Sequence, residues 1–321
     1  MNSYIRLKNC IAFLIAIAFA LPLFSADKYW TGAAGANASL AGSWCDDAEL
    51  TVVSAAAPAD GDDIHLTSGA VGMTWNLNVS VASWKQDGYT GTVTLCTGKK
   101  NGMTTTLYGY TTDNETYVLK VTGDVVVNSG KWQITQQPNY NTTALKGTAA
   151  YTTGQGNYRL ILEADGDVTI GTNATFNAKS LGFRSSQGPA AGSGNSNSAS
   201  HGGMGSRNSS FASGNCYGVV SRPITQGSGA SNGAGGGAVT IISGGAVTVD
   251  GTIDSSGADG GSYHIGAGGS IFIEAQSFSG TGTLNANGGA GKGGFDQGGG
   301  GGRIGIKLTG DGEDFEDFTG V

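Results

Sequence analysis

The sequence predicts an all-β fold, and within that class a right-handed parallel β-helix (a solenoid) with long glycine-rich loops. Three observations lead to this. Short runs rich in Thr, Val, Ile and aromatic residues alternate with a period of two, and helical periodicity is nearly absent after Ala26. Glycine contributes 58 of 321 residues. Two motifs recur at a step of about 32 residues, as in stacked repeats. The handedness follows from the general preference for right-handed crossovers.

Composition excludes several other classes. Hydrophobic residues make up 38% of the chain, enough for a packed core, and the glycines follow no strict Gly-X-Y period, which excludes collagen. The net charge of −7 with few Lys and Arg residues gives no indication of a nucleic-acid surface.

Residues 1–26 form a predicted secretory signal peptide. Arg6 and Lys8 precede an apolar run at 10–24, and the small residues Ser25 and Ala26 follow it. A retained anchor helix is the alternative, but it needs about 20 apolar residues. We therefore expect an exported chain, secreted or at the cell surface, with no transmembrane segment after cleavage.

Export places the remaining cysteines in an oxidising setting. Cys45, Cys96 and Cys216, three cysteines in a long chain, do not make a disulfide framework. A pair between Cys45 and Cys96 stays open, because spacing alone does not establish pairing. The three histidines are widely separated, so no structural zinc site is predicted.

Residues 27–181 are predicted to form an N-terminal cap and the first rungs of the solenoid. Strand patterns occur at residues 64–66, 75–81, 92–95, 125–127, 160–162 and 168–170.

The repeats are clearest in residues 236–308. The pattern Gly-Gly-x-[Val/Ile]-x-Ile begins at Gly236, Gly268 and Gly301, so its three copies are almost evenly spaced. A second pattern begins at Thr252 and Thr283, and its step is nearly the same. Two independent motifs that keep one period indicate stacked structural units.

An earlier copy of the second pattern, at 175–178, lies more than two such steps before the copy at Thr252. This gap fits a glycine- and serine-rich loop over 182–235, inserted into one repeat. The glycine-rich loops are expected to pack on each other as extended polyglycine segments.

The register of the repeats predicts which residues stack. Asn177, Asp254 and Asn285 should form a structural ladder at one corner, where amide side chains can bond along the axis. The predicted inward residues of the rungs are Val239, Ile241, Val247, Val249, Ile253, Ile271, Ile273, Phe278, Leu284, Ile304 and Ile306.

Residues 251–257, 268–273, 280–289 and 298–306, all rich in glycine, carry a family resemblance, as do Tyr-Trp-Thr-Gly at 29–32, Ser-Trp at 43–44 and the acidic segment 58–64. Together they resemble the glycine-rich parallel β-helix proteins of bacterial surfaces and secretions, the autotransporter-passenger-like adhesins. The resemblance implies an exported β-helix used for adhesion or surface structure. Such chains often continue into an anchor; this one ends at Val321, so either the anchor is absent or the chain is a fragment.

Acidic residues are the first candidates for a functional site. Asp60, Asp62 and Asp63 could gather around a Ca²⁺ ion, although a polar turn before the strand at 64–66 is the favoured interpretation. The acids of residues 309–321 are expected to form a solvated tail. No other cofactor is predicted.

A catalytic alternative uses carboxylates on adjacent rungs. In this hypothesis Asp250, Asp254, Asp259 and Glu274 line one face of adjacent rungs, with Lys292 or Arg303 opposite, an arrangement that would suit glycosidic chemistry. The equivalence of Asp254 with Asn177 and Asn285 favours a structural role instead.

Aromatic residues give the only indication of a binding surface. Trp84 and Trp132 are candidates for stacking on sugar rings, with a role in the core as the equal alternative. Trp30, Trp44 and Trp75 are expected to cap the open end of the solenoid core.

The function predicted from the sequence is a structural or adhesive role without catalysis, with an extracellular polysaccharide or a host or cell surface as partner. The alternative is a polysaccharide-active β-helix, either a lyase, a hydrolase or a carbohydrate-binding module. Ice binding is a third and remote hypothesis, because Thr-rich segments occur at 90–94 and 281–283 but not on successive rungs.

Overall fold

The computed structural model describes residues 25–95, 118–135, 159–192, 197–206, 215–231, 233–259, 265–291 and 298–321. Within them the regular structure is β, apart from one turn of 3-10 helix, η1 (Ala41–Ser43). The strands belong to two sheets, of twelve and six strands, and nearly all pairs are parallel. The prediction of an all-β chain is confirmed.

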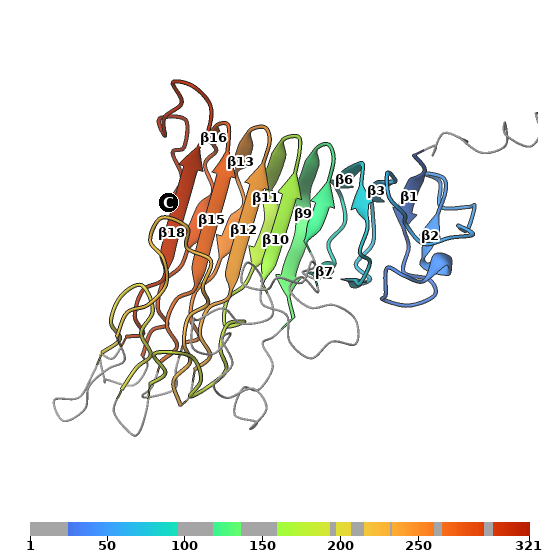
Figure 1. Ribbon diagram of the computed structural model, residues 1–321. Helices are drawn as coiled ribbons and strands as arrows, with labels where there is room; N and C mark the ends of the chain where they lie inside the picture. The colour runs from blue at the N-terminus through green and yellow to red at the C-terminus, as the bar shows by residue number, and fades with distance from the viewer. Residues whose placement is uncertain are drawn as a thin grey trace, which may run out of the picture.

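The twelve-stranded sheet runs along the whole molecule (Figure 1). Its strands are β1 (Asp27–Trp30), β2 (Trp44–Cys45), β3 (Asp63–Leu66), β4 (Met73–Trp75), β6 (Ser83–Gln86), β7 (Thr92–Leu95), β9 (Val125–Ile134), β11 (Val168–Asn177), β13 (Val247–Val249), β14 (Thr252–Asp254), β16 (Phe278–Ser279) and β17 (Thr283–Asn285).

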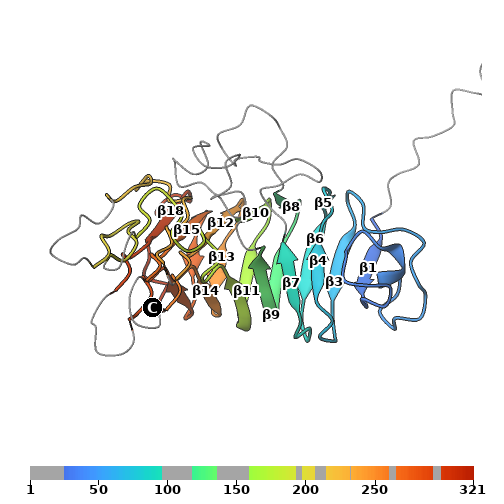
Figure 2. The same ribbon diagram turned by 90° about the horizontal axis from the view of Figure 1, so that it is seen from below.

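The six-stranded sheet lies beside it, and Figure 2 shows the strands of both sheets in sequence along the long axis. Its strands are β5 (Ser80–Val81), β8 (Leu119–Val121), β10 (Leu160–Ala164), β12 (Ala238–Ser243), β15 (Ser270–Ala275) and β18 (Arg303–Leu308).

The chain passes from one sheet to the other and back. It reaches the six-stranded sheet first at β5 and again at β8. From β10 it crosses to β11, returns at β12, crosses to β13 and β14, returns at β15, crosses to β16 and β17, and returns at β18. Each strand pairs with its equivalent in the preceding and following repeat, so every repeat covers the open side of the one before it.

The register confirms the alignment of the repeats. In the six-stranded sheet Ile271 pairs with Val239 on one side and Ile304 on the other, which are equivalent positions of the first motif. In the twelve-stranded sheet Thr252 pairs with Thr175 and Thr283, which begin the copies of the second motif.

One continuous apolar core lies between the sheets. The predicted inward residues that are fully buried are Val239, Ile241, Val247, Val249, Ile253, Ile271, Ile273 and Phe278. Leu284 and Ile306 are half-buried, and Ile304 remains 45% exposed. These three belong to the last repeat, beyond which no further strand covers the core among the described residues.

The glycine-rich connections gather at one side of the sheets, below the strands in Figure 1. They form a glycine bundle, which we define as residues 182–192, 197–206, 225–231, 233–237, 255–259, 265–269, 286–291 and 298–302. Its segments bond to one another through the backbone, as in Gly289 N–H to Gly266 O (3.0 Å) and Gly268 N–H to Gly300 O (2.9 Å). The predicted packing of loop on loop is present in these described segments.

The acidic tail differs from its prediction in part. Its charged side chains are exposed, as expected. However, the backbone of Val321 exchanges hydrogen bonds with Leu284 and Gly282, and the Phe318 ring packs against Phe278 at 4.7 Å between ring centroids. The tail therefore covers the last edge of the twelve-stranded sheet.

Some of the predictions fall outside the described residues. They concern residues 1–24 of the signal peptide, Cys96 and Lys292. Among the described residues, no helix has both the length and the apolar character needed to cross a membrane.

Candidate functional site

The two tryptophans proposed as a sugar platform lie in the core. Trp84 and Trp132 are completely buried, with their rings edge to face at 5.2 Å between centroids. Trp132 also stacks on Phe176 at 4.7 Å and donates its indole N–H to Gln86 Oε1 at 2.9 Å. Of the two alternatives for them, stacking on sugar rings and a role in the core, the structure shows the core role, because both side chains alternate inward on β6 and β9.

Trp30, Trp44 and Trp75 are buried as well, at the N-terminal end of the core where the cap was expected. Their rings continue the edge-to-face series, and Trp75 meets Trp84 at 5.1 Å between centroids. A single row of five indoles thus runs through the first half of the core, beside aliphatic side chains such as Ile64 and Leu66.

Asn177, Asp254 and Asn285 lie side by side on β11, β14 and β17, as the ladder prediction requires. The bonds that hold two of them are local rather than axial. Asp254 Oδ1 accepts the backbone N–H of Ser256 at 2.9 Å, and Asn285 Oδ1 accepts that of Asn287 at 3.1 Å. These side chains turn the chain at the end of each strand, which is the usual role of Asx residues in turns.

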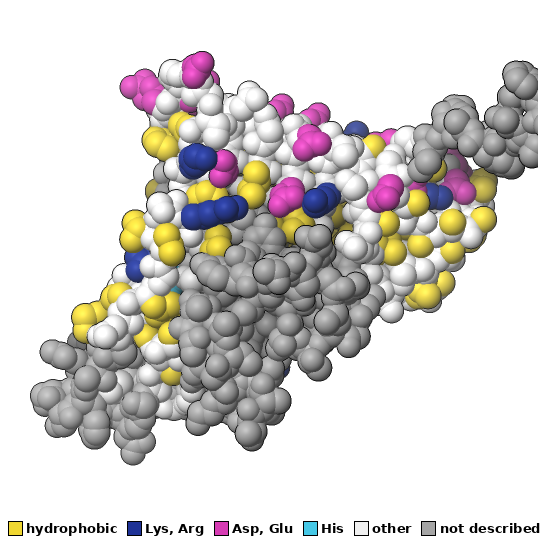
Figure 3. All heavy atoms as spheres, in the orientation of Figure 1, with side chains coloured by type: hydrophobic (Ala, Val, Ile, Leu, Met, Phe, Trp, Pro, Cys, Tyr) yellow, Lys and Arg dark blue, Asp and Glu magenta, His cyan; other side chains and the backbone are white. Residues whose placement is uncertain are grey.

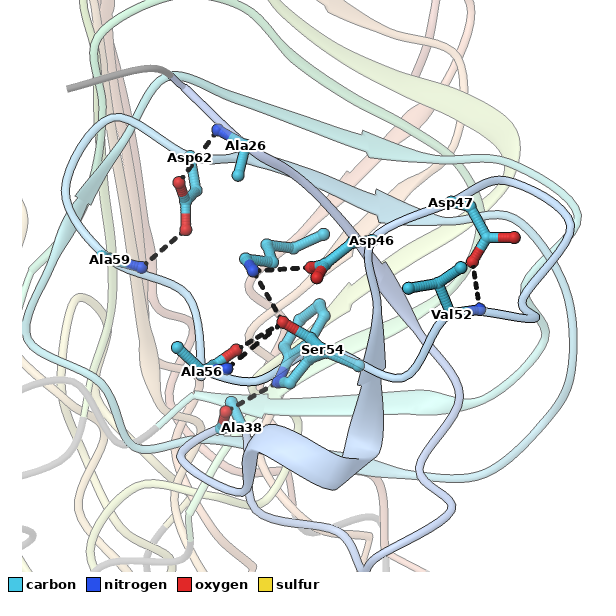
Figure 4. Close-up of polar contacts among 11 residues, drawn as sticks. Ala26, Ala38, Asp46, Asp47, Val52, Ser54, Ala56, Ala59 and Asp62 are labelled. Atoms are coloured by element: carbon cyan, nitrogen blue, oxygen red, sulfur yellow. Dashed lines mark hydrogen bonds and ion pairs between the residues drawn. The ribbon is translucent and has the colours of Figure 1, made fainter. Parts of the chain in front are cut away.

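The Asp60, Asp62 and Asp63 carboxylates have separate protein partners. Asp62 accepts the backbone N–H groups of Ala26 (3.1 Å) and Ala59 (2.9 Å), as Figure 4 shows. The buried Lys28 ammonium contacts Asp46 at 2.7 Å and Ser54 Oγ at 2.7 Å. Within the described part of the chain, no three His, Cys, Asp or Glu side chains are grouped to hold a metal ion.

We expect Asp62→Ala to lower the free energy of unfolding by about 1–3 kcal/mol, because it leaves the backbone N–H of Ala59, and in a chain that retains Ala26 also that of Ala26, unpaired next to a buried position. Asp60→Ala is the matched control. Asp60 is exposed and accepts one N–H, from Ser80, so its loss should cost less than about 0.5 kcal/mol. Urea unfolding measures both variants. A Ca²⁺-dependent rise in the midpoint of the unmodified chain would contradict this account and favour a metal site.

Each carboxylate of the catalytic hypothesis likewise has a partner of its own within the protein. Asp250 accepts from Thr281 N–H at 3.0 Å, and Asp259 from Ala290 N–H at 3.0 Å. Glu274 pairs with Lys307 at 2.8 Å. Each acid thus supports a turn or a strand pair of its own.

Arg303, a cation named in the same hypothesis, has a backbone partner of its own. Its Nη2 donates to the backbone oxygen of Tyr217 at 3.0 Å, on the side of the molecule where the glycine bundle lies.

A buried polar cluster, absent from the predictions, lies where the bundle meets the sheets. His201 is fully buried, and its Nδ1 is 2.7 Å from Gly268 O. A carbonyl oxygen only accepts, so Nδ1 carries the proton and Nε2 accepts from the Thr225 hydroxyl at 2.6 Å. Tyr217 Oη donates to Gln226 O at 2.5 Å. High glycine content hid the cluster in a stretch predicted as a loop.

Burial lowers the pKa of His201 to about 4, from its ordinary value of 6.5. The folded chain therefore binds fewer protons at this site than the unfolded chain, and stability should fall as pH drops from about 6.5 to about 4, by at most about 3 kcal/mol. His201→Gln should flatten this slope in urea unfolding measured across that range. The pKa values of Asp46, Asp47 and Asp63 are lowered from the ordinary value of 3.8, so these carboxylates change the stability mainly at a pH below about 3.8. An unchanged slope in the variant would contradict the assignment.

The cysteines form no site in the described residues. Cys45 is a buried free thiol on β2 and Cys216 an exposed one. Burial raises the pKa of the Cys45 thiol, with Asp47 and Asp46 acting in the same direction, so it is kept protonated and unreactive.

The most regular partly exposed feature is the outer face of β11, β13, β14, β16 and β17. Three rows of polar side chains run along it from repeat to repeat, in register: Thr169, Thr248 and Ser279; Thr175, Thr252 and Thr283; Asn177, Asp254 and Asn285. We call these nine residues the polar rows.

The outer face of the six-stranded sheet is covered in part, and its partly exposed row carries charged side chains, such as Glu163, Glu274 and Lys307, instead of hydroxyl groups. Residues 222–225 cross its outside, where Arg222 lies over the Phe272 ring at 5.5 Å from its centroid and Ser270 Oγ donates to Thr225 O at 2.6 Å. The polar rows are therefore the candidate functional surface. No protein-family model matches the chain, and neither a curated protein nor a solved structure was found to match it.

Proposed function

We propose that this chain is an exported, right-handed parallel β-helix that has a structural or adhesive role outside the cell or at its surface, without catalysis. The observation that carries the proposal is the register of the repeats, which places equivalent polar side chains in the polar rows. The resemblance of the repeats to autotransporter-passenger-like adhesins agrees with it.

The path of the chain supports the β-helix. Parallel strands joined by crossings between two sheets form successive turns of one coil when each crossing has the same hand, and right-handed crossings are strongly preferred. Stacking then provides both the core and the strand pairing, so the fold can extend without a second domain.

The polar rows suit a ligand that itself repeats. Neighbouring strands lie about 4.8 Å apart, so each row presents hydroxyl or amide groups at that interval along the axis. A polysaccharide offers hydroxyl groups at regular intervals, and several weak contacts made together give avidity that one contact does not. We therefore propose an extracellular polysaccharide as the partner.

Export is part of the proposal. It is supported by the order of Arg6 and Lys8, the apolar run at 10–24 and the small residues Ser25 and Ala26.

The test is a binding panel of immobilised neutral and acidic polysaccharides, with and without Ca²⁺, in which retention and the release of reducing or unsaturated ends are both followed. We expect retention that strengthens with polymer length and no released ends. The triple variant Thr175→Ala, Thr252→Ala, Thr283→Ala should bind at least about tenfold more weakly. Its control replaces three exposed threonines outside the rows, Thr67, Thr122 and Thr319, by Ala.

Released ends would overturn the non-catalytic part and favour a polysaccharide-active enzyme. Retention that is equal in the triple variant and its control would contradict the polar rows as the surface. Failure to bind any polymer would remove adhesion to polysaccharides and leave the structural role.

A further inference from the structure

The outer edge of β18 is the one long sheet edge that no described residue covers. The other edges are short or bonded. Residues 52–54 bond along β2, residues 36–38 bond to β4, β5 has two residues, and residues 317–321 bond beside β16 and β17. β18 pairs only with β15 and stands last in its sheet.

Backbone groups of β18 point away from β15 at every second residue. Arg303 N–H and Thr309 N–H both donate toward β15, to Gly269 O and Ala275 O. Because alternate residues of a strand direct their N–H and C=O groups to opposite sides, those of Ile304, Ile306 and Leu308 face outward. Each offers one donor and one acceptor to an incoming strand.

The same three residues carry the apolar side chains at the end of the core. Ile306 and Leu308 pack partly against it, and Ile304 remains 45% exposed. An incoming strand with apolar residues at the matching positions would form hydrogen bonds to this edge and at the same time bury the apolar end of the core.

β18 has few of the devices that keep sheet edges apart. Its sequence, Arg-Ile-Gly-Ile-Lys-Leu, contains no proline and no charged residue on the inward face, and its pairing with β15 has no bulge. The Lys307 side chain lies on the face of the sheet that points away from the core, and its ammonium already pairs with Glu274.

We propose that two copies of this chain associate through β18, antiparallel, about a two-fold axis at Ile306. The occupant is a second copy because β18 is complementary to itself. With Ile306 opposite Ile306, each Ile304 faces the other copy's Leu308, so the outward N–H groups and the apolar side chains match in the same register.

The neighbouring registers are worse. A shift that centres the axis on Gly305 sets Arg303 opposite Lys307, and one centred on Lys307 sets two lysines opposite each other. Like charges directly opposite destabilise a strand pair. Centred on Ile306, Lys307 faces Gly305 and no like charges meet.

Charge beyond the strand favours the same arrangement. The acidic segment 311–317 follows the C-terminal end of β18, at the upper left of Figure 3, where acidic side chains gather. Arg303 begins the strand, and Arg222 lies over Phe272, which is paired with Gly305. Antiparallel pairing brings the acidic segment of each copy to the arginine end of the other.

Sedimentation velocity across the micromolar range tests the proposal on the full chain. We expect a dimer that dissociates on dilution, and a shift of at least about tenfold toward monomer for Ile306→Lys, which places two charges at the axis. Ile242→Lys is the matched control. It makes the same replacement on the outer face of β12, between Glu163 and Glu274, and should leave the dimer unchanged.

Hydrogen exchange of the unmodified chain gives an independent readout that does not depend on how well a variant folds. Protection of the Ile304, Ile306 and Leu308 amides should rise with concentration, while that of amides in β12 stays constant. A chain that is monomeric throughout, assemblies larger than a dimer, a dimer that survives Ile306→Lys, or concentration-independent exchange in β18 would each overturn the proposal.

Discussion

Gly269→Ala is expected to destabilise the chain by about 3 kcal/mol or more, among the largest effects of a single added methyl group. A Cβ atom at this position would overlap the carbonyl oxygen of Gly237 and the backbone of Gly236. Both belong to a neighbouring segment of the glycine bundle, which is bonded on either side and has no room to move. The cost falls on the backbone, where no side chain can rotate away.

Three hydrogen bonds depend on this close approach. Gly269 N–H donates to Ser255 O at 2.7 Å, Gly269 O accepts from Arg303 N–H at 3.0 Å, and Ser270 N–H donates to Gly237 O at 3.0 Å. Displacing Gly269 would therefore disturb the start of both β15 and β18. Urea unfolding gives the loss of free energy, and hydrogen exchange should report faster opening at both strand starts.

Gly301→Ala is the control for Gly269→Ala. Gly301 lies in the same bundle, but a Cβ there would meet nothing within 4 Å and its φ is not positive. Its effect should stay within about 0.5 kcal/mol. Equal losses in the two variants would mean that glycine is needed for its flexibility in general, rather than for the contact at Gly269.

Trp132→Ala is expected to cost about 3–5 kcal/mol, the range for removing a large buried aromatic side chain. The indole fills the core between Trp84 and Phe176, and its N–H pairs with the buried amide of Gln86. Truncation leaves a cavity and an unpaired amide oxygen at once, and the parallel strands on both sides prevent collapse.

Two phenylalanine variants separate the cavity from the hydrogen bond. Trp132→Phe keeps most of the ring but loses the bond to Gln86, whereas Trp84→Phe loses none, because the Trp84 indole nitrogen has no partner. We expect Trp132→Phe to be less stable than Trp84→Phe by about 1 kcal/mol. Thermal unfolding measures the difference. Ready quenching of the tryptophan fluorescence by a soluble quencher would contradict the buried position of the row.

The repeats were the part of the fold that the sequence predicted best. Equivalent apolar residues must meet when repeats stack, so the spacing of Gly236, Gly268 and Gly301 translates directly into the pairing of Val239, Ile271 and Ile304. The prediction that Ile304 is buried was wrong, because a repeating pattern contains no information on which repeat is covered by another one.

The strand pattern at 75–81 was one run in the sequence and became two strands in different sheets, β4 and β5. Alternation continues through a corner when the residues on both sides still face the core, so periodicity alone does not mark the corner. The same ambiguity affected the tryptophans. A Trp at a period of two indicates a strand, but the period is identical for the inward and the outward face.

His201 could not be predicted for a different reason. Its partners, Thr225 and Gly268, lie 24 and 67 residues away, and the bonds exist only after the bundle has packed. A glycine-rich stretch gives no periodic signal of its own. The polar rows were accessible in principle, since the motif that begins at Thr175 contains the positions of two rows.

The insertion between β11 and β12 has a consequence in polymer terms. Residues 178–237 connect β11 to β12. The equivalent connection in the next repeat, from β14 to β15, is made by residues 255–269, so the earlier connection is about four times as long. Closure entropy grows only with the logarithm of length, about 0.6 kcal/mol for each doubling, so the longer loop costs about 1.2 kcal/mol more to close. That amount is smaller than the effect of one misplaced methyl group at Gly269. Closing a longer connection between fixed strand ends therefore adds little free energy, whereas a methyl group added at Gly269 meets backbone atoms at once.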